Sequence, residues 1–201
     1  FTYTALDALS EVKEANSPKL FALDSAAFEQ CREAVVERWR LEFYSQMTFT
    51  LAGLPQHLDV VSLALSLVGL VRFGSEVDSL PDEVVSSALE TIFSLQEETG
   101  FWQTGTLLGT ATGRVGCSSV ELANCLLKLR QVTERFDAFA DHFDRLLQHH
   151  ARSYSHLAPE RGWSVELRRD GNARQTWYGF LVYEFFIRLK SALRKSAGAL
   201  I

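Results

Sequence analysis

Cysteine and proline are both scarce in this chain of 201 residues, which has three cysteines and four prolines. Cys31, Cys117 and Cys125 are scattered, and no two of them form a CxxC pair. An odd number of isolated cysteines predicts neither a disulfide framework nor a zinc ribbon, and it favours a reducing, cytoplasmic compartment. The few prolines, and the lack of clean alternation between apolar and polar residues, argue against a β-protein.

Long apolar runs and an excess of positive charge are also missing. The longest apolar stretch, residues 60–71, is well short of the roughly 20 residues that span a bilayer. The net charge is −5, with acidic and basic residues well mixed, so no general affinity for nucleic acid is indicated. We therefore expect neither a membrane span nor a nucleic-acid partner. No secretory signal is visible, and a chain that begins at Phe1 within helix-like spacing suggests a domain of a longer protein.

What the sequence does contain is helical periodicity. Residues 1–15 predict a short helix, and residues 25–47 predict a longer one with a single apolar stripe (Phe28, Cys31, Val35, Trp39 and Phe43) and a charged remainder. Such a helix is expected to lie across the outside of a domain. We interpret residues 1–56 as an N-terminal helical segment that packs on the rest of the chain.

Residues 57–201 predict an internal repeat of helix pairs. Helices that are apolar nearly all round, and so buried, are expected at about 58–73, 118–130 and 175–195. Amphipathic helices are expected between them, at about 82–97 and 134–152. Each amphipathic helix is followed by a turn with glycine and tryptophan, at Gly100 to Trp102 and at Gly162-Trp163. Recurrence of this kind predicts an all-α fold of antiparallel helix pairs.

The repeat resembles the α/α-toroid repeats of squalene and terpene cyclases and of protein prenyltransferase β subunits. In that family an outer helix ends in a Q…G-x-W-like turn, and a loop enters an inner helix. The matching residues are Gln96…Gly100-Phe101-Trp102 followed by residues 116–123, and Gly162-Trp163 followed by residues 174–180. The likeness covers about 57–195 and implies a partial α/α toroid. Independently of the family, Trp102 and Trp163 are expected to be structural staples, since a tryptophan at a helix end buries about 200 Å².

Asp59 is a weak candidate for a catalytic acid. Terpene cyclases of the protonating class carry an Asp-rich motif at the start of an inner helix, and the corresponding place here has the single carboxyl of Asp59. A lone aspartate before a helix is normally an N-cap, and that is the interpretation we favour.

The family also suggests a zinc site at the mouth of the toroid, built from cysteine, histidine and aspartate. The candidates are Cys117, Cys125, His149, His150 and His156. Zinc needs about four converging ligands. Cys125 lies among leucines, where a thiol packs as a small apolar group, and His149 and His150 look like a solvated helix end. We therefore predict no metal and no cofactor.

Glu121 and Glu184 lie at similar places in two helices that are expected to be buried. A buried carboxylate needs a partner, and Arg114, Arg168, Arg169 or Arg174 in the loops would supply one. The interpretation we favour is an internal salt bridge or a tilt towards solvent. The functional alternative is a binding site at the toroid mouth, where Glu121 and Glu184 are polar groups and Trp177 and Tyr178 form an aromatic wall.

Two functions remain open at this point. The first is a non-catalytic helical module that binds a protein partner, the rest of a longer chain or an apolar small molecule. The second is a divergent terpene-cyclase-like or prenyltransferase-like enzyme that acts on an isoprenoid-like substrate. An enzyme requires a deep apolar cavity with a perturbed acid at its wall, whereas a binding module is expected to expose an apolar patch.

Overall fold

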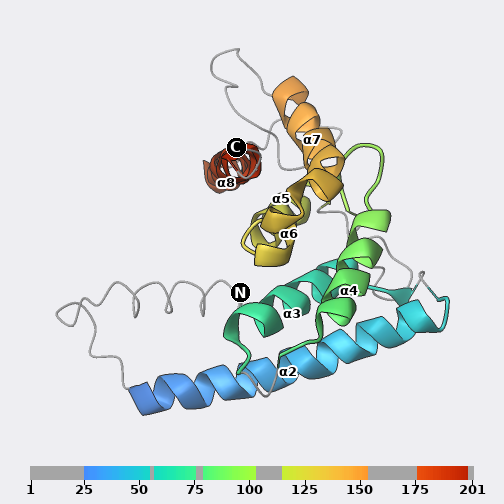
Figure 1. Cartoon of the computed structure of the whole chain (residues 1–201), viewed down its shortest axis with the longest axis vertical. Coiled ribbons are helices and arrows are strands. Elements are labelled where there is room, and N and C mark those ends of the chain that lie inside the picture. Colours follow the sequence, from blue (N-terminus) through green and yellow to red (C-terminus); the bar gives the residue numbers. More distant parts are fainter. Residues whose placement is uncertain (1–24, 55–56, 76–78, 103–114, 154–175, 199–201) are drawn as a thin grey trace.

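A computed structural model describes residues 25–54, 57–75, 79–102, 115–153 and 176–198. These residues form helices and turns, and the described part contains no β-strand beyond one isolated bridge between Gln96 and Trp102. The all-α prediction is confirmed. The helices are α2 (Ser25–Leu51), α3 (Val60–Phe73), α4 (Asp82–Ser94), α5 (Val115–Leu126), α6 (Arg130–Glu134), α7 (Phe136–Ser153) and α8 (Thr176–Gly198) (Figure 1).

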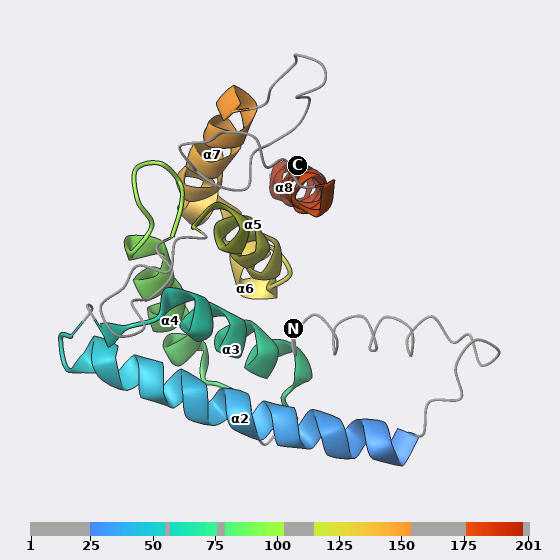
Figure 2. The same cartoon turned by 180° about the vertical axis from the view of Figure 1, so that it is seen from behind.

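The long helix α2 lies along one side of the molecule and packs against α3 (Figures 1 and 2). Its apolar stripe is largely as expected, with Phe28, Val36, Trp39, Phe43 and Met47 buried. Cys31, which the sequence placed in this stripe, is exposed instead. The indole of Trp39 covers Gly69 so closely that a Cβ there would lie 2.5 Å from the ring. Glycine at this position therefore sets the spacing of the two helices.

Helix α3 begins and ends with local signals in the sequence. Asp59 caps its N-terminus, and at the other end the amide of Gly74 donates a 2.9 Å hydrogen bond to the carbonyl of Leu70. The helix is apolar nearly all round because α2, α4 and α5 all pack against it. Its buried apolar residues include Leu63, Ala64, Leu67, Val68 and Leu70.

The remaining helices extend from α3 towards the far end of the molecule. Helix α5 packs against both α3 and α8, while α7 packs against α8. In Figure 1, α5 lies in the middle, with α3 on one side and α8 on the other. The three helices expected to be buried are thus neighbours in space in their sequence order.

One helix expected from the sequence is interrupted in the structure. The expected helix 118–130 ends at Leu126, and the short helix α6 follows a break at Leu129, which has extended backbone angles (φ −79°, ψ 132°). Neither glycine nor proline marks this break, and the interruption is stabilised by packing, since Leu127, Leu129 and Val132 are all buried.

The turn that follows α4, at residues 95–102, contacts three helices: α4, α5 and α7. Gly100 has φ +86°, a conformation that favours glycine, and a Cβ there would lie 2.5 Å from the backbone nitrogen of Leu146 in α7. Trp102 is completely buried, and its indole Nε1–H donates a 2.7 Å hydrogen bond to the carbonyl of Ile92 in α4. Its amide donates to Ser119 Oγ in α5 at 2.9 Å. The expected burial of Trp102 between the helices that it joins is confirmed, while Gly162 and Trp163 lie outside the described residues.

Gln96 completes this turn from the end of α4. Its side-chain amide donates to the carbonyls of Gly100 (2.8 Å) and His142 (3.0 Å), and its Oε1 lies 2.7 Å from His142 Nδ1. The glutamine that begins the Q…G-x-W pattern therefore holds the end of α4 against α7. A buried amide with this many partners fixes the relative position of the two helices.

Candidate binding cleft

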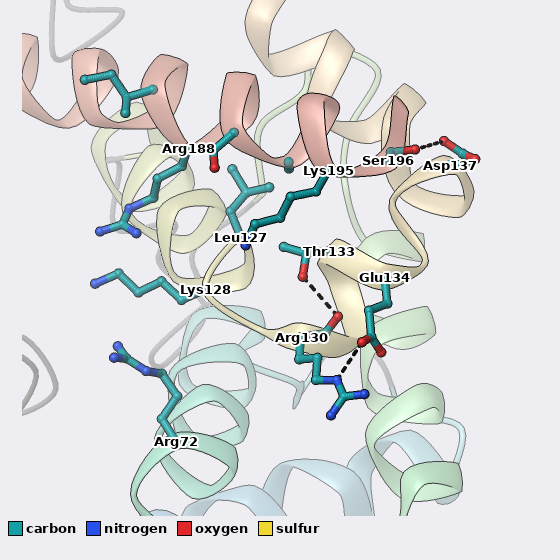
Figure 3. A pocket seen from close by; sticks show the side chains of 13 residues that line it. Arg72, Leu127, Lys128, Arg130, Thr133, Glu134, Asp137, Arg188, Lys195 and Ser196 are labelled. Atoms are coloured by element: carbon teal, nitrogen blue, oxygen red, sulfur yellow. Dashed lines mark hydrogen bonds and ion pairs between the residues drawn. The ribbon is translucent and has the colours of Figure 1, made fainter. Parts of the chain in front are cut away.

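A cleft of about 830 Å³ opens between the end of α3, the α5–α6 segment and α8 (Figure 3). Its walls carry five cationic and two acidic side chains, on a chain whose net charge is −5. The lining residues are Arg72, Leu127, Lys128, Arg130, Thr133, Glu134, Asp137, Ile187, Arg188, Ser191, Ala192, Lys195 and Ser196. Positive charge is thus concentrated at one place on an acidic molecule, and a cleft of one sign attracts ligands of the other.

Three of the cations form a row across three elements, which we call the basic row: Arg72, Lys128 and Arg188. In Figure 3 their side chains extend towards the same side of the cleft. Arg72 lies in the last turn of α3, and Lys128 follows the end of α5. Cations at helix C-termini interact favourably with the helix dipole, which applies to Arg72 and Lys128, whereas Arg188 lies in the middle of α8. The row as a whole is created by the packing of the helices.

The guanidinium of Arg188 is only partly engaged by its neighbour. Its Nε and Nη2 both donate to Glu184 Oε1, at 2.8 and 2.6 Å. A guanidinium has five N–H donors, so this contact leaves donors for a ligand. The side chains of Arg188 and Glu184 are 30% and 40% exposed, so this ion pair is in contact with solvent.

The opposite wall of the cleft is held by its own contacts. Arg130 Nε donates to Glu134 Oε1 at 2.6 Å, and this hydrogen bond raises the pKa of Arg130. Near the end of α8, Ser196 Oγ donates to Asp137 Oδ1 of α7 at 2.9 Å. The two acids of the cleft are therefore occupied on the wall away from the basic row, as Figure 3 shows.

Glu184 has a different ion-pair partner from those expected from the sequence. The expected partners were loop arginines, which lie outside the described residues, and the partner in the structure is Arg188 on the same helix. Glu121 is partly exposed on α5, and no contact joins it to Glu184 within the described part of the chain. The side chains of Trp177 and Tyr178 lie outside that part, so the expected aromatic wall stays a prediction.

Asp59 acts as an N-cap. Its Oδ1 accepts from the amides of Val61 (3.0 Å) and Ser62 (3.3 Å), and its Oδ2 accepts from Ser62 Oγ at 3.0 Å. The amide of Asp59 donates to Gln46 Oε1 of α2 at 2.8 Å. Both carboxylate oxygens thus bind the first turn of α3, which is the structural role favoured from the sequence.

The expectation that His149 and His150 form a solvated helix end is wrong for His150, which is 1% exposed. The end of α7 packs against the 95–102 turn, and the ring of Phe101 lies 4.3 Å from that of His149 and 6.0 Å from that of His150. Burial, with a smaller effect of the His149 charge, lowers the pKa of His150 to about 3. Histidine here serves as an aromatic packing group.

Of the other zinc candidates, the structure describes the side chain of Cys125 and not those of Cys117 and His156. Cys125 is buried among leucines, as expected, while His156 and the side chain of Cys117 lie outside the described part. Among the residues that the structure does describe, no three cysteine, histidine or acidic side chains converge as metal ligands would.

Sequence reasoning missed the cleft because its residues are far apart in the chain. It also missed Asn124, a buried residue of α5 whose Nδ2 donates to the carbonyl of Leu181 in α8 at 3.0 Å and joins the two helices. A polar residue among Leu122, Cys125 and Leu126 is the one local signal that was available for it.

Comparison with known proteins gives no relative: no family model, no curated protein and no solved structure matches this chain. None of the helices within the described ranges combines the length and apolar character needed to cross a membrane.

Proposed function

We propose that this chain is a non-catalytic module that binds another protein, or the rest of a longer chain, and that it is built as an arc of an α/α toroid. The observation that carries the proposal is that α8 is apolar on two opposite faces. One face, with Val182, Phe185 and Leu189, is buried in the core. The opposite face exposes Phe180, Tyr183 and Ile187, which are 69%, 62% and 50% exposed.

These three exposed residues, which we call the outer stripe, follow the spacing i, i+3, i+7 of one helix face. Large apolar side chains that are contiguous on a surface are typical of sites that bind other proteins. An amphipathic helix that lays its apolar face along α8 would cover such a stripe, which is a common mode of recognition. Ile187 also lines the cleft, so the outer stripe and the cleft are continuous.

The arrangement of the helices supports the toroid part of the proposal. In an α/α toroid the inner helices are neighbours in sequence order, and α3, α5 and α8 pack in that order. The Gln96 to Trp102 turn joins an amphipathic helix to a buried one, as the family resemblance implies. On this basis α8 is the open end of the arc, and its outer stripe is where the next helix would pack.

The competing proposal is a divergent terpene-cyclase-like or prenyltransferase-like enzyme. Such an enzyme would need an apolar cavity, and the cleft described above is instead open and lined by charged side chains. The acid in the family's position, Asp59, is held by the backbone of its own helix. Both observations favour binding over catalysis.

A synthetic peptide tests the proposal. The probe is a helical peptide with leucines on one face and glutamines on the other, titrated against the full chain by fluorescence anisotropy. We expect binding that is lost in the variant Phe180→Ser/Tyr183→Ser/Ile187→Ser. The matched control is Leu41→Ser/Tyr44→Ser/Leu51→Ser, which removes three exposed apolar residues from α2 and should bind normally.

Equal binding by wild type and the outer-stripe variant would refute the apolar docking face. The enzyme alternative is tested separately by incubating the chain with a polyprenyl diphosphate. The proposal predicts that the substrate is recovered unchanged, and turnover that depends on Asp59, tested with Asp59→Asn, would replace binding with catalysis.

A further inference from the structure

We propose that the outer face of α2 pairs, antiparallel, with the same face of a second copy of this chain. The face consists of Leu41, Tyr44, Thr48 and Leu51, which we call the α2 stripe. All four residues are exposed, and Leu41, Tyr44 and Leu51 are 66%, 51% and 84% exposed. This inference goes beyond the proposed function, which concerns α8 at the other end of the chain.

The α2 stripe has the spacing of a contact between two helices. Its members lie three, four and three residues apart, which is the a/d pattern with which one helix packs on another. Helix α2 runs along one side of the molecule (Figures 1 and 2), and its buried residues pack against α3. It therefore has two faces suited to helix packing, of which α3 covers one and the α2 stripe is exposed.

The distribution of charge along α2 favours contact between two copies at this stripe. Residues 26–40 contain six charged side chains, whereas residues 41–54 contain one, that of Glu42. The carboxylate of Glu42 accepts a 2.8 Å hydrogen bond from the side-chain amide of Gln46, a buried residue. Identical surfaces that carry like charges repel each other, and this part of α2 avoids that cost. Loss of charge beside tyrosine and leucine is also typical of the centre of an interface.

The spacing of the α2 stripe is the same in both directions, and this identifies a second copy as the partner. In a two-fold interface residue i contacts residue j of the partner, and j contacts i. With the axis at the level of Gln46, Leu41 faces the partner's Leu51 and Tyr44 faces the partner's Thr48. The two-fold axis repeats both contacts, so every residue of the stripe has an apolar counterpart.

The polar atoms of the stripe allow it to be covered. Thr48 Oγ1 donates a 2.8 Å hydrogen bond to the carbonyl of Tyr44, so its hydroxyl proton is already used within α2. A buried hydroxyl without such a partner would oppose association. The ring of Tyr44 packs edge-on against that of Phe43, with 5.5 Å between the centroids, and this contact limits the freedom that the ring would lose on pairing.

The length of the stripe sets the expected strength of the dimer. Residues 41–51 form about three helical turns, and a contact of this length from each copy belongs to the small interfaces of less than about 1,200 Å². We therefore expect a reversible dimer with a dissociation constant in the micromolar range. Because each copy has a net charge of −5, added salt should tighten the dimer by screening the repulsion between the two copies.

Sedimentation equilibrium of the full chain over a range of concentrations tests the proposal. We expect the wild type to show a monomer–dimer equilibrium. The variant Leu41→Ser/Tyr44→Ser/Leu51→Ser should be monomeric throughout, with an unchanged circular dichroism spectrum. The matched control is Phe180→Ser/Tyr183→Ser/Ile187→Ser in α8, which should dimerise as wild type does. A wild type that stays monomeric well above micromolar concentrations overturns the proposal.

Two charged variants test the antiparallel arrangement. Leu41→Lys alone, or Leu51→Glu alone, places a charge against leucine in both outer layers, and each should weaken self-association at least tenfold. In an equal mixture the new lysine of one copy faces the new glutamate of the other, and the remaining two leucines face each other. The mixed dimer should therefore form at least tenfold more tightly than either variant with itself. A parallel pair would place each new charge against leucine, so a mixture without recovery contradicts the proposal.

The outcomes separate this inference from the proposed function. A dimer that is lost in the α8 variant and kept in the α2 variant overturns the inference, because α8 is then the surface where two copies meet. Dimerisation that requires the α2 stripe supports the inference whatever the result of the peptide titration, since that titration depends on α8 alone.

Discussion

Trp102 is held both by packing in the core and by hydrogen bonds to two helices. It is completely buried, contacts the ring of Phe93 at 6.0 Å between centroids, and makes hydrogen bonds to α4 and α5. Loss of the indole would leave a large cavity and would also leave the carbonyl of Ile92 without this donor. Both effects destabilise the folded state.

We therefore predict that Trp102→Ala lowers the free energy of unfolding by about 3–5 kcal/mol. This is a large part of the about 5–15 kcal/mol that stabilises a typical domain. Urea denaturation followed by circular dichroism measures the change. The control is Tyr44→Ala, a residue that is 51% exposed on α2. A Trp102→Ala variant as stable as the control would show that the turn is not a structural staple.

The histidines at the end of α7 predict a dependence of stability on pH. Burial lowers the pKa of His150 to about 3, and it also lowers the pKa values of His142 and His149. Below the unfolded pKa of about 6.5 the unfolded chain binds protons that the folded chain does not, so stability falls as pH falls. For His150 this loss extends from about pH 6.5 to about pH 3.

The expected slope is about 1.4 kcal/mol per pH unit for one histidine over the window in which only the unfolded form is protonated. Urea midpoints measured between pH 7 and pH 4, with the pH values chosen to bracket the unfolded pKa, give this slope. His150→Phe keeps an aromatic ring and removes the titrating group, so its stability should depend less on pH than that of wild type. An identical slope in the two proteins would contradict the burial of His150.

These residues also show where sequence reasoning succeeds and where it fails. The roles of Trp102 and Asp59 follow from local rules, because a tryptophan that closely follows a turn glycine and an aspartate before an apolar helix have few alternative uses. His150 has no such local signature. Its burial depends on the close approach of Gly100 to α7, which is a contact between segments far apart in the chain.

At the scale of the element, α8 has one apolar face that packs in the core and another that we propose binds a partner. Phe185 is completely buried, while Phe180, one turn and a half earlier, is 69% exposed. The sequence predicted a helix that is buried all round, because periodicity alone does not say which apolar face has a partner. Residues of the same type on one helix therefore have different energetic roles.

We predict that Phe185→Ala lowers the free energy of unfolding by about 3–5 kcal/mol, the range for a large aromatic residue in a core. In contrast, Phe180→Ala should change it by about 0.5 kcal/mol or less, as surface substitutions usually do. Thermal unfolding of the two variants beside wild type measures the difference. Equal and large losses would mean that the outer stripe is covered within this chain.

The α5–α6 break shows what limits predictions at this scale. Apolar spacing from Val120 to Leu129 continues through the end of α5 without glycine or proline, so the sequence favoured one helix. The structure ends α5 at Leu126 and turns the chain at Leu129. This turn brings Lys128 and Arg130 to the cleft, so the feature that was hardest to predict also shapes the candidate site.

At the scale of the whole molecule, the helical class and the order of the helices were predictable, and the cleft was not. Hydrophobic periodicity specifies each helix from its own residues. The basic row instead combines the last turn of α3, the second residue after α5 and the middle of α8, and it exists only once those helices are packed. Considered alone, Arg72 and Lys128 are ordinary residues at helix ends, and Arg188 is an ordinary member of an ion pair within one helix.

The most direct test of the account is hydrogen–deuterium exchange of the full chain with and without the helical leucine/glutamine peptide. We expect the bound peptide to slow exchange in α8 and in the α5–α6 segment, because these elements carry the outer stripe and line the cleft. Exchange in α2 should be unchanged. If the peptide binds and slows exchange only in α2 or α4, or fails to bind at all, then α8 and its cleft are not the binding surface and the central claim is wrong.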